Sequence, residues 1–505
     1  MNVHRPIAPV TVSLALLQAA TLLSGGCTQA GTDVEKRIAA VESGLLPAVR
    51  IQGRDTAMVL ADRMAHYNVP GVSIAVINEG EIEWAAGYGV LDASSEIPVN
   101  EATVFQAASI SKPIAVAAAL RRVQDGTLDL DTDVNTWLSS WQLPSNELTE
   151  RRAVTLRGIM SHTAGLTVHG FPGYAMGTSL PTVPQILDGA EPANTSAVRV
   201  DKLPGEGFRY SGGGMTIMQL VLTDLTGQQF PTVMRESVLD PLGMTRSTYQ
   251  QPLPTEWRAN AATAHDGDGH PIDGRFHVYP EMAAAGLWTT PTDLARFAIE
   301  VQRAHTSGSS KILTHEMVER ALMPQAGGPY GLGLSLESEG ETLRFGHGGS
   351  NEGFRCRMIA YADLGMGAVV MTNGSQGSAL AEEILNGIAR VYGWPDYLDE
   401  EIVPAAVDRA SYQRYLGLYR FSPEAQDEVS VAWIRVSEED AQLVAVAEGQ
   451  DPAELIPLSD TEFLIVTPRV SVEFVSDDSG VVDRLVLKIQ GGGQVEALKE
   501  RREPS

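Results

Sequence analysis

The stretch of sequence that decides the fold is Ala108-Ser109-Ile110-Ser111-Lys112-Pro113, which directly precedes an apolar run typical of a helix. If the helix begins here, Lys112 lies three residues after Ser109 on the same helix face. Pro113 favours this start, because proline is tolerated in the first turn of a helix and not in its interior. A lysine whose pKa is lowered by burial or by a second cation can take the proton of a serine hydroxyl. The pattern predicts an activated serine, although Ser109 also suits a plain helix N-cap with Lys112 as a surface charge.

Two later stretches bear on this choice. The first is Phe208-Arg209-Tyr210-Ser211-Gly212-Gly213-Gly214, and the second is Gly346-His347-Gly348-Gly349-Ser350-Asn351-Glu352-Gly353-Phe354. Taken singly, Tyr210 is typical of a half-buried aromatic, His347 of a structural histidine, and the glycines of a turn. Their order after the Ser109 stretch is what gives them weight.

In this order, the three stretches resemble the motifs of the serine β-lactamase and penicillin-binding-protein superfamily, in the form found in its class C-like branch. The resemblance covers roughly residues 56–395 and includes the framework stretches 155–166, 242–248 and 285–294. It implies an α/β (α+β) fold in which an antiparallel sheet is flanked by helices. The site then lies between this sheet and a helical subdomain.

The resemblance also implies roles for four side chains. Ser109 is expected to attack a carbonyl and become acylated, while Lys112 and Tyr210 share the proton transfers. Tyr210 is expected to act as a tyrosinate base, because a nearby ammonium lowers the pKa of a tyrosine. His347 is expected to hold the proton network or a substrate carboxylate, and to titrate near neutral pH.

By the same resemblance, the oxyanion hole is formed by the backbone N–H groups of Ser109 and Ser350. Ser350 follows Gly349 on an expected edge strand. A side chain at Gly348 or Gly349 is expected to crowd a substrate that lies along this strand.

Two residues depart from the β-lactamase pattern. Gly212 stands where many members have an asparagine that binds the amide of a β-lactam, and His347 replaces a lysine that pairs with its carboxylate. We therefore expect a serine hydrolase of the peptidase or esterase type, acting on a D-residue peptide, a cell-wall fragment or a small ester. The alternatives are a true β-lactamase and a non-catalytic penicillin-binding-like sensor.

Period-two apolar patterns and turn residues predict the strands of the sheet. A hairpin is expected over residues 71–85 and another over 357–372, with helices at 115–123 and 215–225 between them. The first and last strands thus flank a helical insertion. From about residue 412, short strands recur about every ten residues, which predicts a small all-β barrel or sandwich. The start of this tail, 415–419, resembles a lipocalin-like domain, for which covering the cleft, oligomerisation, ligand binding and structural support are all open.

The N-terminus has the features of an export signal. Arg5 precedes an apolar stretch from Ile7 to Leu23, and Ser24-Gly25-Gly26 leads to Cys27. The cysteine after two glycines resembles a bacterial lipoprotein cut site, so lipidation of Cys27 is expected, with plain export or an unprocessed anchor as alternatives. The expected segments are a signal at 1–27, a linker or helix at 28–55, a hydrolase domain at 56–400 and a barrel at 410–505. The expected location is the periplasm or cell envelope.

Composition excludes several other classes of protein. The 505 residues carry a formal net charge of −26, which repels nucleic-acid backbones. Two cysteines are too few for a disulfide framework or a cysteine zinc site. The Asp266-Gly267-Asp268-Gly269-His270 stretch lacks the ligand pattern of a calcium loop and is interpreted as a hairpin turn. We expect no metal or cofactor, a small-molecule or peptide substrate as partner, and leave the oligomeric state open.

Overall fold

A computed structural model of the chain describes residues 32–54, 57–429, 431–439, 441–466, 469–488 and 494–500. These residues divide into two compact units, the first holding 32–46 and 57–398, the second 47–54 and 399–500. The expected export signal and Cys27 lie outside the described residues. Within the described part of the chain, none of the helices has the length and apolar character needed to cross a membrane.

The first unit is built on a six-stranded antiparallel sheet in the order β2-β1-β8-β7-β6-β5. Its strands are β1 (Gly71–Asn78), β2 (Glu81–Gly89), β5 (Ser335–Glu337), β6 (Arg344–Asn351), β7 (Phe354–Tyr361) and β8 (Gly367–Thr372). β1 pairs with β8, with Val72 opposite Thr372. The first and last strands therefore lie side by side in the sheet, and the helical insertion that they were predicted to flank lies between them in the sequence. Both predicted hairpins are confirmed.

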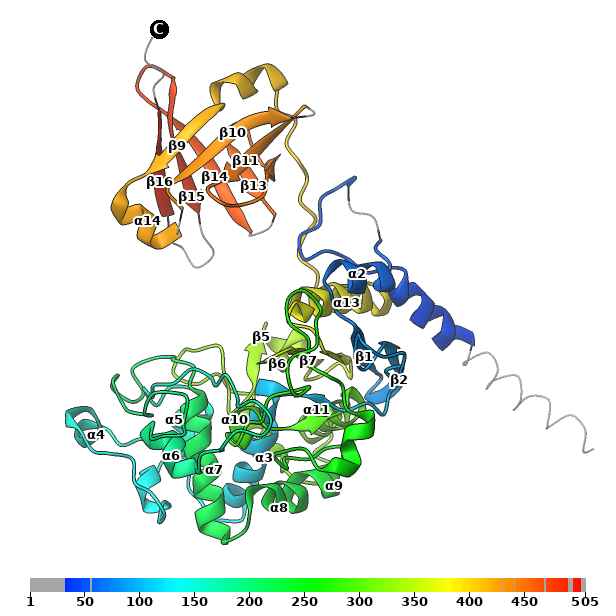
Figure 1. The fold of residues 1–505 in the computed structure, drawn as a ribbon, viewed down its shortest axis with the longest axis vertical. Coiled ribbons are helices and arrows are strands. Elements are labelled where there is room, and N and C mark those ends of the chain that lie inside the picture. The colour runs from blue at the N-terminus through cyan, green and yellow to red at the C-terminus, as the bar shows by residue number, and fades with distance from the viewer. Residues whose placement is uncertain are drawn as a thin grey trace, which may run out of the picture. The chain divides into compact units, whose positions relative to one another are not determined.

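Helices cover both faces of this sheet (Figure 1). On one face, Val72, Ile74 and Val76 of β1 pack in one apolar cluster with α13 (Gly377–Tyr392) and α2 (Leu60–His66). On the other face, Ala75 and Ile77 join the large cluster that contains α3 (Ser111–Gln124) and α11 (Pro291–Thr306). The alternation of β1 side chains between two cores follows from the period of two in a strand.

The chain between β2 and β5 is mainly helical. Besides α3 and α11 it contains α4 (Glu147–Arg151), α5 (Leu156–Met160), α6 (Val183–Asp188), α7 (Gly212–Thr226), α8 (Phe230–Met234), α9 (Asp240–Leu242), α10 (Met282–Ala285) and α12 (His315–Ala321). Two short strands, β3 (Phe105–Gln106) and β4 (Trp288–Thr289), pair with each other. α3 and α7 confirm the two predicted helices, and α7 is capped by Ser211, whose side chain accepts the Gly214 N–H.

The second unit is a closed antiparallel barrel in the order β10-β11-β12-β13-β14-β15-β16-β9. Its strands are β9 (Gly417–Phe421), β10 (Trp433–Glu439), β11 (Gln442–Ala447), β12 (Ala453–Pro457), β13 (Glu462–Ile465), β14 (Val470–Ser476), β15 (Val482–Lys488) and β16 (Gln494–Lys499). The small all-β domain predicted from about residue 412 is confirmed, and α14 (Pro423–Val429) lies between β9 and β10 in the sequence. Aromatic side chains fill the barrel interior, where Phe474 stacks on Tyr415 and contacts Phe463.

Residues 28–55, expected as one linker or helix, are divided between the two units. A helix over 32–42 belongs to the first, where Val41 and Leu45 are buried beside α13. In the second, Val49 and Ile51 pack against Ile456 of the barrel. The buried apolar side chains on both sides of Pro47 explain why this stretch is not a free linker.

Candidate active site

Ser109 lies in a short 3₁₀ helix, Ala108–Ile110, and not in the first turn of α3 as the sequence suggested. Ala108 has a φ of +49°, in the left-handed region that a residue with a Cβ rarely adopts. The Ser111 hydroxyl donates to the Ala108 carbonyl at 2.5 Å and accepts the Leu287 N–H at 3.0 Å. This support holds the strained turn and leaves Ser109 partly exposed.

Lys112 lies in the first turn of α3 with its side chain turned toward Ser109. Its Nζ is 2.8 Å from Ser109 Oγ and donates to the Ala284 carbonyl of α10 at 2.8 Å. The residue is 2% exposed, and burial lowers its pKa from 10.5 to about 7. A large share of the Lys112 amines is therefore neutral at pH 7, as a base for Ser109 requires.

Tyr210 completes this group, with Lys112 Nζ 5.0 Å from the centre of its ring. The expected tyrosinate is wrong, because burial raises the pKa of Tyr210 and its hydrogen bond to Ser109 does not offset that effect. The phenol stays protonated at neutral pH. It can therefore donate a proton or a hydrogen bond, but it does not start as the base.

His347 on β6 also differs from its expected state. Burial, helped by the charge of Lys112, lowers its pKa to about 3, so the expectation that it titrates near neutral pH is wrong. Its Nδ1–H donates to the Gly348 carbonyl at 2.5 Å, since a carbonyl can only accept. Its Nε2 then faces the Tyr330 hydroxyl at 3.5 Å. A neutral histidine with its N–H already committed is poorly suited to hold a carboxylate.

The open edge of β6 passes directly beside the nucleophile. β5 pairs with residues 344–346 only, so the part from 347 to 351 has no strand partner on that side. A Cβ on Gly349 would lie 2.3 Å from the Ala107 carbonyl oxygen, whereas one on Gly348 would meet nothing closer than 3.8 Å. The close approach of β6 to the Ser109 turn thus requires Gly349, and it places Ser350 next to this contact.

Three further residues, to which the sequence assigned no role in the site, fix this edge. Asn351 Nδ2 donates to Gln106 Oε1 at 2.7 Å and to the Ala285 carbonyl at 3.1 Å. α10 therefore holds Lys112 through Ala284 and the end of β6 through Ala285. Cys356, opposite Gly349 on β7, is buried, and its thiol donates to the Gln106 carbonyl at 3.2 Å.

Aromatic rings surround Tyr210. The His162 ring lies tilted against the Tyr210 ring, with 4.2 Å between the ring centroids. His162 has a φ of +58° and accepts the Ser211 N–H on Nδ1 at 3.2 Å. Tyr330 lies 6.1 Å from Tyr210, and Phe208 stacks on Tyr330 at 5.4 Å. The sequence held little signal for Tyr330, which follows a Gly-Gly-Pro turn.

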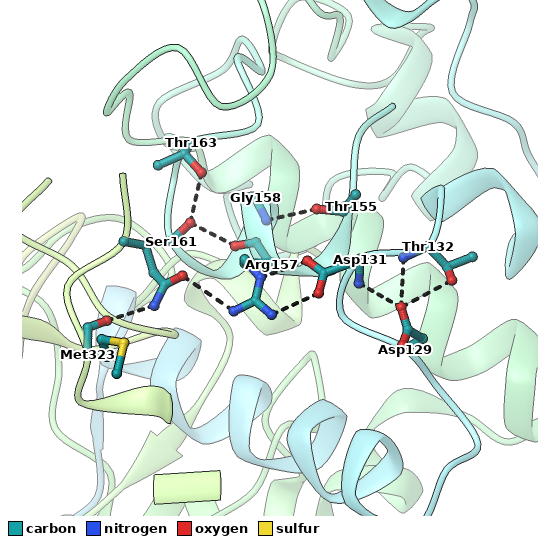
Figure 2. A network of polar contacts seen from close by, with 10 residues as sticks. Asp129, Asp131, Thr132, Thr155, Arg157, Gly158, Ser161, Thr163 and Met323 are labelled. Carbon is teal, nitrogen blue, oxygen red and sulfur yellow. Dashed lines mark hydrogen bonds and ion pairs between the residues drawn. The ribbon is translucent and has the colours of Figure 1, made fainter. Parts of the chain in front are cut away.

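Figure 2 shows a network of polar contacts around Arg157, Asp131 and Ser161. Arg157 of α5 forms a two-point ion pair with Asp131 at 2.7 and 2.8 Å. It also donates to Gln325 Oε1 at 3.4 Å, and the Gln325 N–H donates to the Tyr330 carbonyl at 2.9 Å. The Ser161 hydroxyl donates to the Arg157 carbonyl and so holds the turn that carries His162.

The Asp266–His270 stretch is a turn, as interpreted from the sequence. The Asp266 carboxylate accepts the backbone N–H groups of Asp268 and His270, at 3.0 and 2.9 Å. The Asp266, Asp268 and His270 side chains could reach one ion. The backbone hydrogen bonds to Asp266 are those of an Asx turn, which explains the turn without an ion.

A family model described as Beta-lactamase matches residues 57–393, which include Ser109, Lys112, Tyr210 and His347. The chain belongs to the Beta-lactamase family. This family consists of serine hydrolases and acyltransferases. The match to the family model ends at residue 393, before the first strand of the barrel.

Named relatives agree with membership of the Beta-lactamase family. The chain is 23% identical to penicillin-binding protein 4* of Bacillus subtilis over 449 residues, which is 84% of this chain and 93% of the relative. It is 25% identical to protein flp of Staphylococcus aureus over 232 residues, 45% of this chain. The chain spans only 42% of the length of that relative.

Solved structures show the same fold. A penicillin-binding protein homologue from Pyrococcus abyssi, described as octameric, has a TM-score of 0.56 at 20% identity and covers 86% of this chain and 98% of its own. A D-amino acid amidase from Ochrobactrum anthropi has a TM-score of 0.55 at 22% identity, covering 72% of this chain and 98% of its own. At these identities the likeness concerns the fold.

Proposed function

We propose that this member of the Beta-lactamase family is a class C-like serine hydrolase that cleaves an ester or a peptide amide through an acyl-enzyme. The observation that carries the proposal is the buried Lys112 amine, 2.8 Å from Ser109 Oγ, with its pKa lowered to about 7. Burying an ammonium is costly, and a protein that only binds its ligand gains nothing from it. The arrangement therefore favours the enzyme over the sensor.

The reaction follows from the protonation states. Neutral Lys112 takes the Ser109 proton while Oγ forms a bond to the substrate carbonyl carbon, and the carbonyl oxygen becomes an oxyanion. The N–H groups of Ser109 and Ser350 stabilise that oxyanion. When the tetrahedral intermediate collapses, the bond to the leaving oxygen or nitrogen breaks, and the leaving group takes the proton through the Tyr210 phenol. Water then repeats the sequence on the acyl-enzyme, releases the acid and restores Ser109.

The true β-lactamase is the weaker candidate. A Cβ on Gly212 would lie 3.0 Å from the His169 carbonyl oxygen and 3.1 Å from the Phe171 ring. The space for an asparagine, which binds the β-lactam amide in many family members, is thus occupied by this loop. His347 is neutral and cannot replace the lysine that pairs with a carboxylate. Similarity to a D-amino acid amidase supports D-residue amides as substrates.

A substrate panel tests this function. The full-length chain should hydrolyse p-nitrophenyl acetate or D-alanine p-nitroanilide faster than the chromogenic cephalosporin nitrocefin, and Ser109→Ala should abolish all turnover. Equal rates in wild type and Ser109→Ala would contradict the proposal. If nitrocefin were the best substrate, the β-lactamase would become the favoured function.

We also propose export to the cell envelope, with attachment to a membrane through lipidated Cys27. The support is the sequence alone: a basic residue, an apolar stretch and small residues before Cys27. In a bacterial host, metabolic labelling with a palmitate analogue should mark the wild-type chain and not Cys27→Ser. Equal labelling of both would overturn lipidation at this residue.

A further inference from the structure

One aromatic side chain of the cluster around Tyr210 is more exposed than the others. Phe208 has 37% of its surface accessible, more than any other phenylalanine, tyrosine or tryptophan within the described residues. It lies two residues before Tyr210, and its ring stacks on Tyr330 with 18° between the planes. A ring of this size is stabilised by burial, and Phe208 contacts Tyr330, which in turn contacts Tyr210 of the proposed site. Its exposure there suggests that a substrate covers it.

The Phe208–Tyr330 pair is held in place before any substrate arrives. The Tyr330 and His347 ring centroids are 5.7 Å apart, and the Tyr330 loop is tied to Arg157 through Gln325. A Cβ on Gly328 would lie 3.2 Å from the Phe208 Cβ, so this loop is shaped around the phenylalanine. A fixed aromatic face lowers the entropy cost of binding a flat apolar group.

Two arginines near this face are already paired with carboxylates. Arg209, next to Phe208, is paired with Asp201, and Arg357, opposite Gly348, donates to Glu337 at 2.5 Å. His347 has committed its Nδ1–H to a backbone carbonyl. These groups offer no free cation to a carboxylate, and the aromatic pair offers a stacking surface.

We propose that the substrate carries an uncharged aromatic group beside the scissile bond, and that this group stacks on Phe208 and Tyr330. The inference rests on the proposed function, because it names the substrate class of the same site. Aromatic stacking and the burial of a ring together should raise kcat/KM about tenfold over that of a substrate with a methyl group at the same place.

The test uses esters of methanol and benzyl alcohol, so that no activated phenol leaving group confuses the comparison. Proton release by the full-length chain gives kcat/KM for methyl acetate, methyl phenylacetate and benzyl acetate. The last two place the ring on the acyl side and on the leaving side. We expect at least one of them to exceed methyl acetate by about tenfold, and 4-carboxylation of its ring to remove the advantage.

The variant Phe208→Ala should reduce the ratio of aromatic ester to acetate by about fivefold or more, and Phe208→Leu should reduce it less. Ile97→Ala is the control, because Ile97 is 56% exposed elsewhere on the first unit and should leave the ratio unchanged. Equal turnover of aromatic esters and acetate by wild type, or an unchanged ratio in Phe208→Ala, would overturn the inference. Acetate turnover that disappears in Ser109→Ala would still support the hydrolase, so the two proposals fail separately.

Discussion

The contact between β6 and the Ser109 turn gives the sharpest prediction, through the substitution Gly349→Ala. The new Cβ would lie 2.3 Å from the Ala107 carbonyl oxygen, whereas ordinary contacts begin at 3.4 Å. β6 must therefore move by about 1 Å, with an overpacking cost of about 1–3 kcal/mol. Ser350 follows directly and moves with the strand. If its N–H serves the oxyanion, the loss of that donor should lower kcat about 100-fold or more.

The assay is hydrolysis of p-nitrophenyl acetate at matched folded fraction, checked by thermal unfolding. Gly348→Ala is the matched control, because its Cβ meets no protein atom closer than 3.8 Å. We expect this neighbour to lose less than about threefold. Activity of Gly349→Ala within about threefold of wild type, or equal damage by both substitutions, would refute the assignment of this edge to the oxyanion hole.

Three further predictions concern the base, its surroundings and the barrel. The kcat/KM should rise with pH through about 7, because Lys112 must be neutral to act and burial lowers its pKa to about 7; a pH–rate profile that is flat from 6 to 8 would contradict this. Arg157→Met should free Gln325 and Tyr330, which should speed hydrogen exchange at the Tyr330 loop and lower kcat/KM a few-fold; unchanged exchange would count against the support in Figure 2. Phe474→Ala should destabilise the barrel by about 3–5 kcal/mol in urea unfolding, because Phe474 is 2% exposed between Tyr415 and Phe463; a loss below about 1 kcal/mol would mean that the aromatic interior is loosely packed.

The parts of the site that were predictable depend on short-range spacing. Ser109 and Lys112 are three residues apart at a helix start, and the 2.8 Å contact follows from helical geometry once that start is fixed. The strands β1 and β8 were predictable for a similar reason, since each has a local apolar pattern bounded by turn residues. The exact start of the helix was not predictable, because the 3₁₀ turn at Ala108 depends on hydrogen bonds that involve Ser111 and Leu287.

Burial is what the sequence could not supply. The charge of Lys112 was expected to lower the pKa of Tyr210, but desolvation dominates in the folded chain and raises it. Desolvation also lowers the pKa of His347 to about 3, so this histidine does not titrate near neutral pH. From the sequence, a side chain at Gly349 was expected to crowd the substrate. In the structure its Cβ would instead meet the Ala107 carbonyl, more than 200 residues earlier in the chain. Such contacts are set by the tertiary fold, so no local pattern contains them.

The most direct test of the central claim is the rate and position of covalent labelling by a fluorophosphonate at pH 8. Intact mass and peptide mapping should show one adduct, on Ser109. The adduct should be absent in Ser109→Ala and should form about 100-fold more slowly in Lys112→Met, because the base is missing. A folded wild-type chain that takes no label, or a Lys112→Met variant that is labelled at the wild-type rate, would contradict a serine activated by a buried lysine.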